Sequence, residues 1–247
     1  MYVRLKHTLS ELALRALGAP PARRAAVWLR AYCELAAHEG ETTPEAGTSA
    51  RPEAGLDVPL RTVATRARRA GGGTSLPRWL LARGLLERDG PVVRLPEPYR
   101  DHFPYLRRHA HRLTAALRWL RRPAPRGVPV HMARAAALFD AGLFFECHEY
   151  LEGIWRRAAA RDRPFYQGII LVAAAFYHYE KGNAHGVRSK LAGGFARLDG
   201  YRPVYRGVLV DRWLRRLTPW RARAASGIAA GPLRPADIPR LPLGYPR

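Results

Sequence analysis

One short stretch of this sequence carries side chains that could do acid–base chemistry or bind a metal ion. His148 and Glu152 are four residues apart, and Glu149 lies between them. Residues four apart share one face of an α-helix, so His148 and Glu152 would lie together, with Glu149 at the edge of that face. The same face would carry Phe144 and Trp155. A carboxylate one turn from an imidazole can fix its tautomer and favour its protonation.

The next apolar segment offers two partners for this pair. Gln167 and His178 are eleven residues apart, so on a helix they point within about 20° of each other. That segment is apolar on all sides, which is typical of a helix at the centre of its domain. If the two helices pack antiparallel, we expect His148, Glu149, Glu152, Gln167 and His178 to form one buried polar cluster.

Three interpretations of this cluster stay open. His148, Glu152 and His178 are candidate ligands of a divalent metal, because imidazole and carboxylate suit zinc, iron or manganese. A metal is not favoured, because no second acidic helix complements this segment, and the cofactor is unknown. The cluster could also form a pocket for a small ligand or for acid–base chemistry. In the third interpretation it is a hydrogen-bond network that sets the register of the helices. The pattern assigns no catalytic residue and no reaction.

Five helices are expected to build the C-terminal half that carries the cluster. Their predicted ranges are 131–141, 143–160, 164–181, 185–198 and 205–217. Asn183 is expected to cap the fourth helix, and Glu146 is expected nearer solvent. The longest apolar run, 168–177, is too short to span a bilayer, and no apolar signal core follows Met1. We therefore expect a cytoplasmic protein that has no membrane partner.

Several separated motifs in this half resemble a known family. They are Phe-Asp-Ala-Gly at 139–142, the run 146–149 with Glu152 and Trp155, the runs 165–170 and 173–175, His178, and Gly182-Asn183 with Gly186. Over about residues 128–217 the chain resembles the domain of unknown function 309 family, which often has Ala in place of Cys147. The resemblance implies a compact all-helical bundle and no established reaction.

The first 120 residues are expected to form a winged-helix-like domain. Helices are predicted over 9–17, 21–38, 59–69 and 76–82, and strands over 85–88 and 92–95. Thr8 has capping-box spacing to Glu11, and Asp57 could cap the third helix. Asp89-Gly90 between the two strands is a strong hairpin signal. The predicted fold class is mainly α: an N-terminal winged-helix-like domain with a small β-hairpin, plus a C-terminal all-α helical bundle.

Composition suggests where these domains begin and end. Residues 40–55 are rich in Gly, Glu, Thr, Pro and Ser, and are predicted to form a flexible loop. The proline-rich basic segment 121–127 is predicted to link a domain over 1–120 to a helical bundle over 128–217, and 218–247 to be a Pro/Arg-rich tail. Cys33 and Cys147 lie far apart in different domains, which predicts two buried reduced thiols.

The formal net charge of +22, from 42 Lys and Arg against 20 Asp and Glu, would attract nucleic acid. Only three of the basic residues are lysine, so codon bias toward arginine could explain part of the charge. Candidate nucleic-acid contacts on the helix-turn-helix and wing are Arg61, Arg66, Arg68, Arg69, Arg78, Arg83 and Arg94. Few nearby side chains suit base edges, so phosphate contacts are expected before sequence reading.

These observations favour a non-enzymatic protein. Its basic N-terminal domain would bind nucleic acid (DNA) or a protein partner, and its bundle would sense a ligand or dock a protein. One alternative is a metal- or small-ligand-binding enzyme centred on His148, Glu152 and His178. The other is a purely structural helical bundle. The sequence does not predict an oligomeric state.

Overall fold

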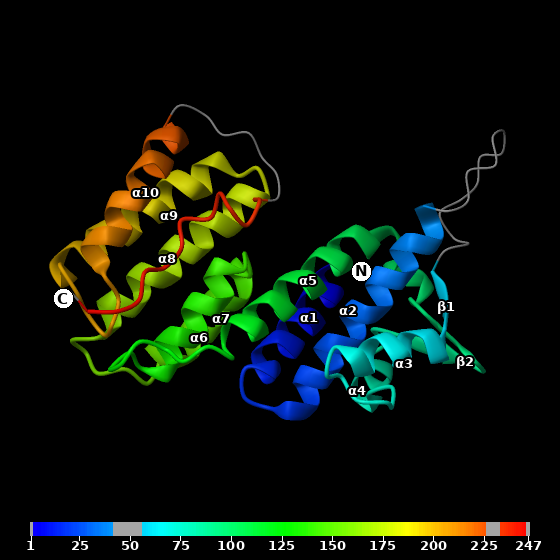
Figure 1. The fold of residues 1–247 in the computed structure, drawn as a ribbon. Helices are drawn as coiled ribbons and strands as arrows, with labels where there is room; N and C mark the ends of the chain where they lie inside the picture. The colour runs from blue at the N-terminus through cyan, green and yellow to red at the C-terminus, as the bar shows by residue number, and fades with distance from the viewer. Residues whose placement is uncertain (1, 42–55, 226–232, 246–247) are drawn as a thin grey trace. The chain divides into compact units, whose positions relative to one another are not determined.

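The protein is mainly helical and contains one small antiparallel sheet (Figure 1). The computed structural model describes residues 2–41, 56–225 and 233–245. The chain forms two compact units, Met1–Leu117 and Arg118–Arg247, which we call the N-terminal unit and the bundle unit. Most of the predicted loop at 40–55 lies outside the described residues. Within the described part, no helix has both the length and the apolar character needed to cross a bilayer.

The N-terminal unit alternates helices with short strands. Its elements are α1 (Tyr2–Ala16), α2 (Pro20–Glu41), β1 (Asp57–Pro59), α3 (Leu60–Arg69), α4 (Arg78–Ala82), β2 (Glu87–Asp89), β3 (Val92–Arg94), η1 (Glu97–His102) and α5 (Phe103–Trp119), in which the boundary between the units falls. Strand β3 lies between β1 and β2 and is antiparallel to both, with Val93 opposite Val58 and Arg88. The predicted hairpin is confirmed as β2 and β3, and Gly90 in its turn has a φ of 53°.

Helix α2 supplies the largest side chains to the core of this unit. Trp28 and Tyr32 are fully buried, as are Leu80 of α4 and Val93 of β3. Trp28 Nε1 donates to the carbonyl oxygen of Gly72 (3.1 Å), and Tyr32 Oη donates to the carbonyl oxygen of Leu56 (2.7 Å). Because a buried donor without a partner is costly, these two bonds hold the segments around β1 and after α3 against α2.

Two predicted helix caps in this unit are wrong. Helix α1 begins at Tyr2, so Thr8 lies inside it and donates to the carbonyl oxygen of Arg4 (3.0 Å) instead of capping. Asp57 does not cap α3, because it belongs to β1 and lies opposite Arg94. Both errors arise where a local capping signal competes with pairing or packing elsewhere in the chain.

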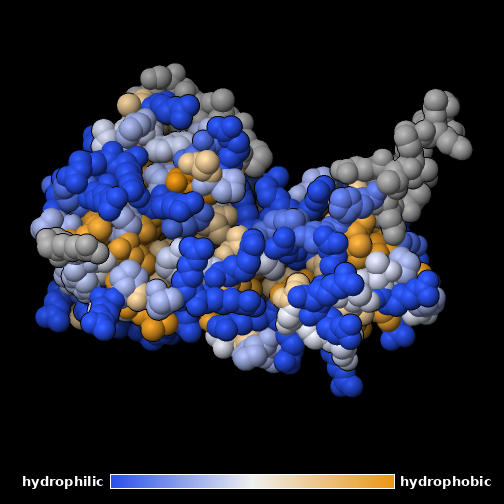
Figure 2. Space-filling model, viewed as in Figure 1, coloured by the Kyte–Doolittle hydropathy of each residue, from blue (hydrophilic) through white to orange (hydrophobic). Residues whose placement is uncertain are grey.

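The described part of the bundle unit consists mainly of helices. Its elements are α6 (Val130–Asp140), α7 (Phe144–Trp155), α8 (Arg163–Glu180), α9 (Ala184–Leu198), η2 (Asp199–Tyr201) and α10 (Val210–Ala225). Rings from four of these helices meet in its core: the centroid of Phe139 lies 5.2 Å from Phe144, 5.5 Å from Phe176 and 5.5 Å from Trp213. Hydrophilic residues cover most of the visible surface of the protein (Figure 2), consistent with burial of the large apolar side chains.

Helices α8 and α9 approach each other closely at glycines. A Cβ atom on Gly168 of α8 would lie 2.6 Å from Leu198 Cγ, and one on Gly194 of α9 would lie 2.9 Å from Val172 Cγ2. Both distances are shorter than van der Waals contact, so a side chain at either glycine would push the two helices apart.

The C-terminal strap, residues 233–245, lies along the bundle unit and is drawn in red in Figure 1. Trp213 Nε1 donates to the carbonyl oxygen of Pro239 (2.9 Å). The backbone N–H of Leu209 donates to the carbonyl oxygen of Pro242 (2.9 Å). Leu241 of the strap is buried. Helix α10 also runs past its predicted end at 217, so the predicted tail contains a helical part and an ordered strap.

Candidate functional site

The polar residues of α7 form a small cluster at the surface of the bundle unit. His148 Nδ1 lies 3.3 Å from Glu149 Oε1, and His148 Nε2 lies 3.3 Å from Glu152 Oε1. Glu152 Oε2 also accepts a hydrogen bond from Arg156 (3.0 Å). The exposed fractions of the His148, Glu149 and Glu152 side chains are 27%, 40% and 33%, so water reaches this cluster.

In this geometry the imidazole of His148 lies between two carboxylates. The carboxylates are partly hydrated, and Glu152 also binds Arg156, so water and the guanidinium group screen their charge. The Phe145 ring stacks beside His148 with centroids 6.4 Å apart and contacts Tyr177 of α8 at 5.5 Å.

The structure places His178 elsewhere, at the junction of α8 and α9. Its ring fills the space above Gly186, where an added Cβ would lie 2.6 Å from His178 Cγ. The side-chain amide nitrogen of Asn183, Nδ2, lies 3.2 Å from His178 Nδ1. Because this amide group donates, Nδ1 is the acceptor. Burial, together with the positive charge of Lys190, holds the pKa of His178 below its usual value. His178 is therefore neutral near pH 7 and packs as part of the helix junction.

Gln167 also contacts α9. Its Oε1 accepts a hydrogen bond from Arg197 Nε (2.8 Å), and Arg197 donates in turn to the carbonyl oxygen of Gly193 (3.2 Å). The five residues predicted to form one cluster thus divide between two places: His148, Glu149 and Glu152 on α7, and Gln167 and His178 at the contact with α9.

The residues around both places agree with a known family. Residues 132–189 match the model of the domain of unknown function family DUF309. The resemblance inferred from the sequence motifs is thereby confirmed over this segment, which begins in α6 and ends in α9. We call residues 132–189 the DUF309 segment. Comparison with curated proteins and with solved structures gives no match.

The DUF309 segment does not gather metal ligands. Among the residues that the structure describes, no three His, Cys, Asp or Glu side chains come close enough to hold one metal ion.

Cys147 is fully buried, its Sγ donates to the carbonyl oxygen of Ala135 (3.5 Å), and burial raises its pKa far above the usual range. Cys33 is likewise buried and free, so the prediction of two buried thiols is confirmed. Glu146, expected nearer solvent, is only 3% exposed.

Asn183 caps α9, as predicted from the sequence. Its Oδ1 accepts the amide hydrogen of Gly186 (2.8 Å) while its amide group holds His178. Asn183→Ala removes both bonds and is expected to destabilise the bundle unit by about 1 kcal/mol, measured by denaturant unfolding. Asn183→Asp keeps the cap and should retain most of the stability. Equal losses in the two variants would contradict a capping role.

Asp140 at the end of α6 is a residue that the sequence analysis gave no role. Its Oδ1 accepts the amide hydrogen of Leu241 in the C-terminal strap (2.8 Å). Burial raises the pKa of Asp140 to about 7, against the opposing effects of the Leu241 amide, Arg240 and Arg216. The strap comes from about a hundred residues further along the chain, so no local pattern could have indicated this contact.

Asp162 anchors a second polar group that the sequence analysis missed. Tyr205 Oη donates to Asp162 Oδ1, and Arg206 Nη2 donates to Asp162 Oδ2 (2.6 Å). The hydrogen bond from Tyr205 and the charge of Arg206 hold the pKa of Asp162 below its usual value. Arg206 has a φ of 48°, a strained conformation for a residue with a side chain. Because Asp162 is 5% exposed and both oxygens are occupied, we assign it a structural role.

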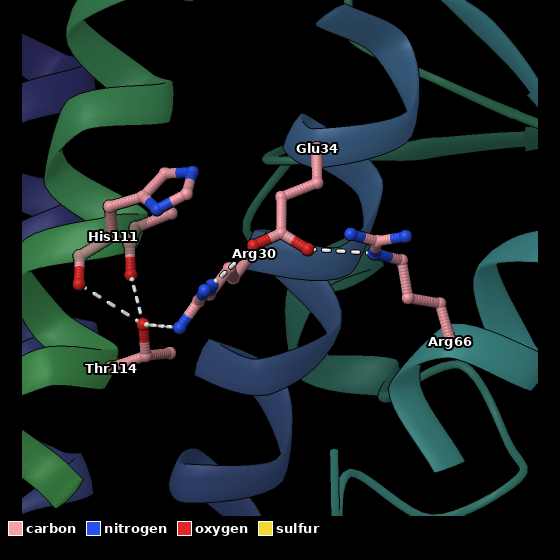
Figure 3. Close-up of polar contacts among 6 residues, drawn as sticks. Arg30, Glu34, Arg66, His111 and Thr114 are labelled. Atoms are coloured by element: carbon pink, nitrogen blue, oxygen red, sulfur yellow. Dashed lines mark hydrogen bonds and ion pairs between the residues drawn. The ribbon is translucent and has the colours of Figure 1, made fainter. Parts of the chain in front are cut away.

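Three of the predicted nucleic-acid arginines are bound to carboxylates. Arg66 Nε donates to Glu34 Oε2 (2.7 Å), and Figure 3 shows this carboxylate also holding Arg30, which reaches Thr114 of α5. Burial favours a higher pKa for Glu34, but the hydrogen bonds from Arg66 and Arg30 lower it below its usual value. This network joins α2, α3 and α5. Arg83 pairs with Glu11 at 2.6 Å, and Arg94 pairs with Asp89.

The other four predicted arginines are exposed and make no ion pair with any residue in the described part of the chain. They are Arg61, Arg68, Arg69 and Arg78. On α3, Val63 and Ala67 are buried. Arg61, Arg68 and Arg69 lie within about 100° of one another on the opposite side. The structure therefore brings three of the seven predicted arginines to one outward face of α3.

Proposed function

We propose that the N-terminal unit is a winged-helix-like domain that binds the phosphate backbone of nucleic acid through the outward face of α3. The observation that carries the proposal is the arginine set Arg61, Arg68 and Arg69, which is exposed, lies on one face and has no carboxylate partner among the described residues. Phosphates are the strongest natural partners of such guanidinium groups. The order α2, β1, α3, α4, β2, β3 supports a winged-helix topology.

The arrangement of arginines and helices in the N-terminal unit fits contacts to phosphates better than sequence-specific contacts to base edges. Helix α4, which takes the position of a recognition helix in this topology, has five residues and spans about 8 Å. Such a helix presents few side chains to a major groove. We therefore expect binding that depends strongly on salt and weakly on sequence. The bundle unit would be a non-enzymatic docking or ligand-sensing module.

Triple replacement of the free arginines tests the proposal. The variant Arg61→Gln/Arg68→Gln/Arg69→Gln is expected to bind a labelled DNA duplex at least about tenfold more weakly at low salt. The slope of log affinity against log salt should also fall by about 2 to 3. Fluorescence anisotropy over a series of salt concentrations measures both quantities.

A charge-matched variant provides the control. Arg15→Gln/Arg83→Gln/Arg94→Gln removes the same charge, but each of these arginines pairs with a carboxylate. We expect its affinity to change less than threefold, which is about 0.6 kcal/mol. Equal weakening in both triple variants would show that net charge alone governs binding and would end the assignment to α3.

A structural role for part of the DUF309 segment has direct geometric support. His178 packs on Gly186, and Asn183 joins that ring to the first turn of α9. This arrangement favours the interpretation in which polar residues set the register of α8 and α9. A small-ligand function would therefore rest on the partly exposed side chains of His148, Glu149 and Glu152 on α7.

A further inference from the structure

Helix α10 of the bundle unit carries a second concentration of arginine. Its sequence contains Arg212, Arg215, Arg216, Arg221 and Arg223, and its one acidic residue is Asp211. The neighbouring C-terminal strap adds Arg234 and Arg240 against Asp237. Hydrophilic residues gather over α10 in Figure 2. None of these residues belongs to the DUF309 segment or to the proposed surface on α3.

Three of the α10 arginines share one exposed side. Arg212, Arg216 and Arg223 are all exposed, and on a regular helix they lie within about 40° of one another. They span about 16 Å along the helix axis. Leu214, which is buried, lies on the opposite side of the helix. The three guanidinium groups therefore form a row along the outward side of α10.

The nearby carboxylates are already occupied. Asp211 accepts from Arg202 (2.5 Å) and from Arg215. Asp237 accepts from Arg234 Nε (2.7 Å) and Nη2 (3.1 Å), although the charge of Arg223 also reaches it. Arg216 donates to a backbone oxygen of the strap, that of Arg240, at 3.5 Å. The row thus keeps most of its positive charge unneutralised.

Asp140 is the remaining carboxyl near this row. It faces Arg216 and Arg240, but its Oδ1 accepts the amide hydrogen of Leu241. Arg223 lies over the ring of Trp220, with its guanidinium carbon 5.4 Å from the ring centroid. A guanidinium group can bind phosphate and can also stack on a nucleic-acid base.

We infer that the row Arg212, Arg216 and Arg223 on α10 is a second nucleic-acid-binding surface, which contacts phosphates independently of α3. A lipid surface fits less well, because the apolar side of α10 is inside the core and no apolar face is left to insert between lipids. Arginine guanidinium groups suit phosphate oxygens better than isolated carboxylates of a protein partner. Two surfaces on one chain would raise the affinity for a long strand through avidity.

Charge-neutral variants of the full-length chain test this inference. Arg212→Gln/Arg216→Gln/Arg223→Gln is expected to bind labelled single-stranded DNA about tenfold more weakly, with the salt slope reduced by about 2. The matched control is Arg157→Gln/Arg161→Gln/Arg188→Gln, which removes the same charge from exposed arginines of the same unit that lie outside α10 and the strap. The control should change affinity less than threefold. Circular dichroism and melting should be unaltered for the α10 variant, because its three side chains are exposed.

The outcomes separate this inference from the proposal for α3. If the α3 variant loses affinity and the α10 variant does not, the α10 surface is disproved and the proposed function stands. The opposite result disproves the α3 surface alone. Equal losses for the α10 variant and its control would overturn the inference. The inference would also be overturned if the α10 variant lost binding to vesicles of anionic lipid but retained binding to DNA.

Discussion

Gly168→Ala is expected to destabilise the bundle unit by about 1 to 3 kcal/mol, although alanine is the better helix former. A methyl group at Gly168 would lie 2.6 Å from Leu198 Cγ and 2.9 Å from Leu198 Cδ2. Leu198 is fully buried, so it cannot move aside without disturbing the core. The gain in helix propensity is about 1 kcal/mol, and the steric cost of separating α8 from α9 exceeds it.

Gly153→Ala is the matched control for this substitution. Gly153 lies inside α7, and an added Cβ there meets nothing within 4 Å. With no steric cost, the substitution should raise the free energy of unfolding by about 0.5 to 1 kcal/mol. Chemical denaturation of both variants, followed by circular dichroism, measures the difference. Stabilisation by Gly168→Ala would show that α8 and α9 are not in close contact there.

Asp140→Asn is expected to make the bundle unit more stable at pH 8 and to remove a pH dependence of its stability. The pKa of Asp140 rises from an ordinary value of 3.8 to about 7 in the folded protein. Between these values the unfolded chain releases the proton while the folded chain keeps it, so stability falls as pH rises. The loss is complete above about pH 7 and amounts to at most about 4 kcal/mol, at 1.4 kcal/mol per pKa unit. Asparagine keeps an oxygen that can accept the Leu241 amide hydrogen.

The measurement is the free energy of unfolding of both proteins at several pH values from 4 to 8. The difference between Asp140→Asn and the unchanged protein should grow in favour of the variant as pH rises. Asp237→Asn is a suitable comparison, because Arg234 holds the pKa of Asp237 below its usual value. Its contribution to stability is lost only as pH falls toward the acid range, which has the opposite sign. Parallel pH curves for Asp140→Asn and the unchanged protein would contradict the raised pKa.

The position of His178 shows what a helical pattern can and cannot predict. Spacing correctly indicated that Gln167 and His178 lie on one side of a helix, and α8 is present as expected. Spacing cannot indicate which neighbour that side meets. The structure turns it toward α9, where Gly186 leaves room for the imidazole ring. The expected convergence with His148 depended on that choice of neighbour, which is a long-range property.

The arginines of the N-terminal unit illustrate the same limit for charge. All seven candidates are similar by sequence, since each lies near a predicted helix or strand of a basic domain. The structure distinguishes them by their partners: Glu34 and Glu11 neutralise Arg66 and Arg83, while Arg61 and Arg68 have no such partner among the described residues. Glu34 is 32 positions from Arg66, so only the packing of α2 against α3 reveals this ion pair.

The sequence by itself determined the local elements: the helices of the DUF309 segment, the cap at Asn183 and the hairpin at Gly90. Their signals are periodicity, capping residues and turn residues, which act within a few positions of the chain. Only the tertiary structure decided that Asp57 joins a strand, that Glu146 is buried, and that the strap reaches Asp140. These outcomes depend on contacts between distant segments, whose free energy comes from burial and pairing that no local pattern records.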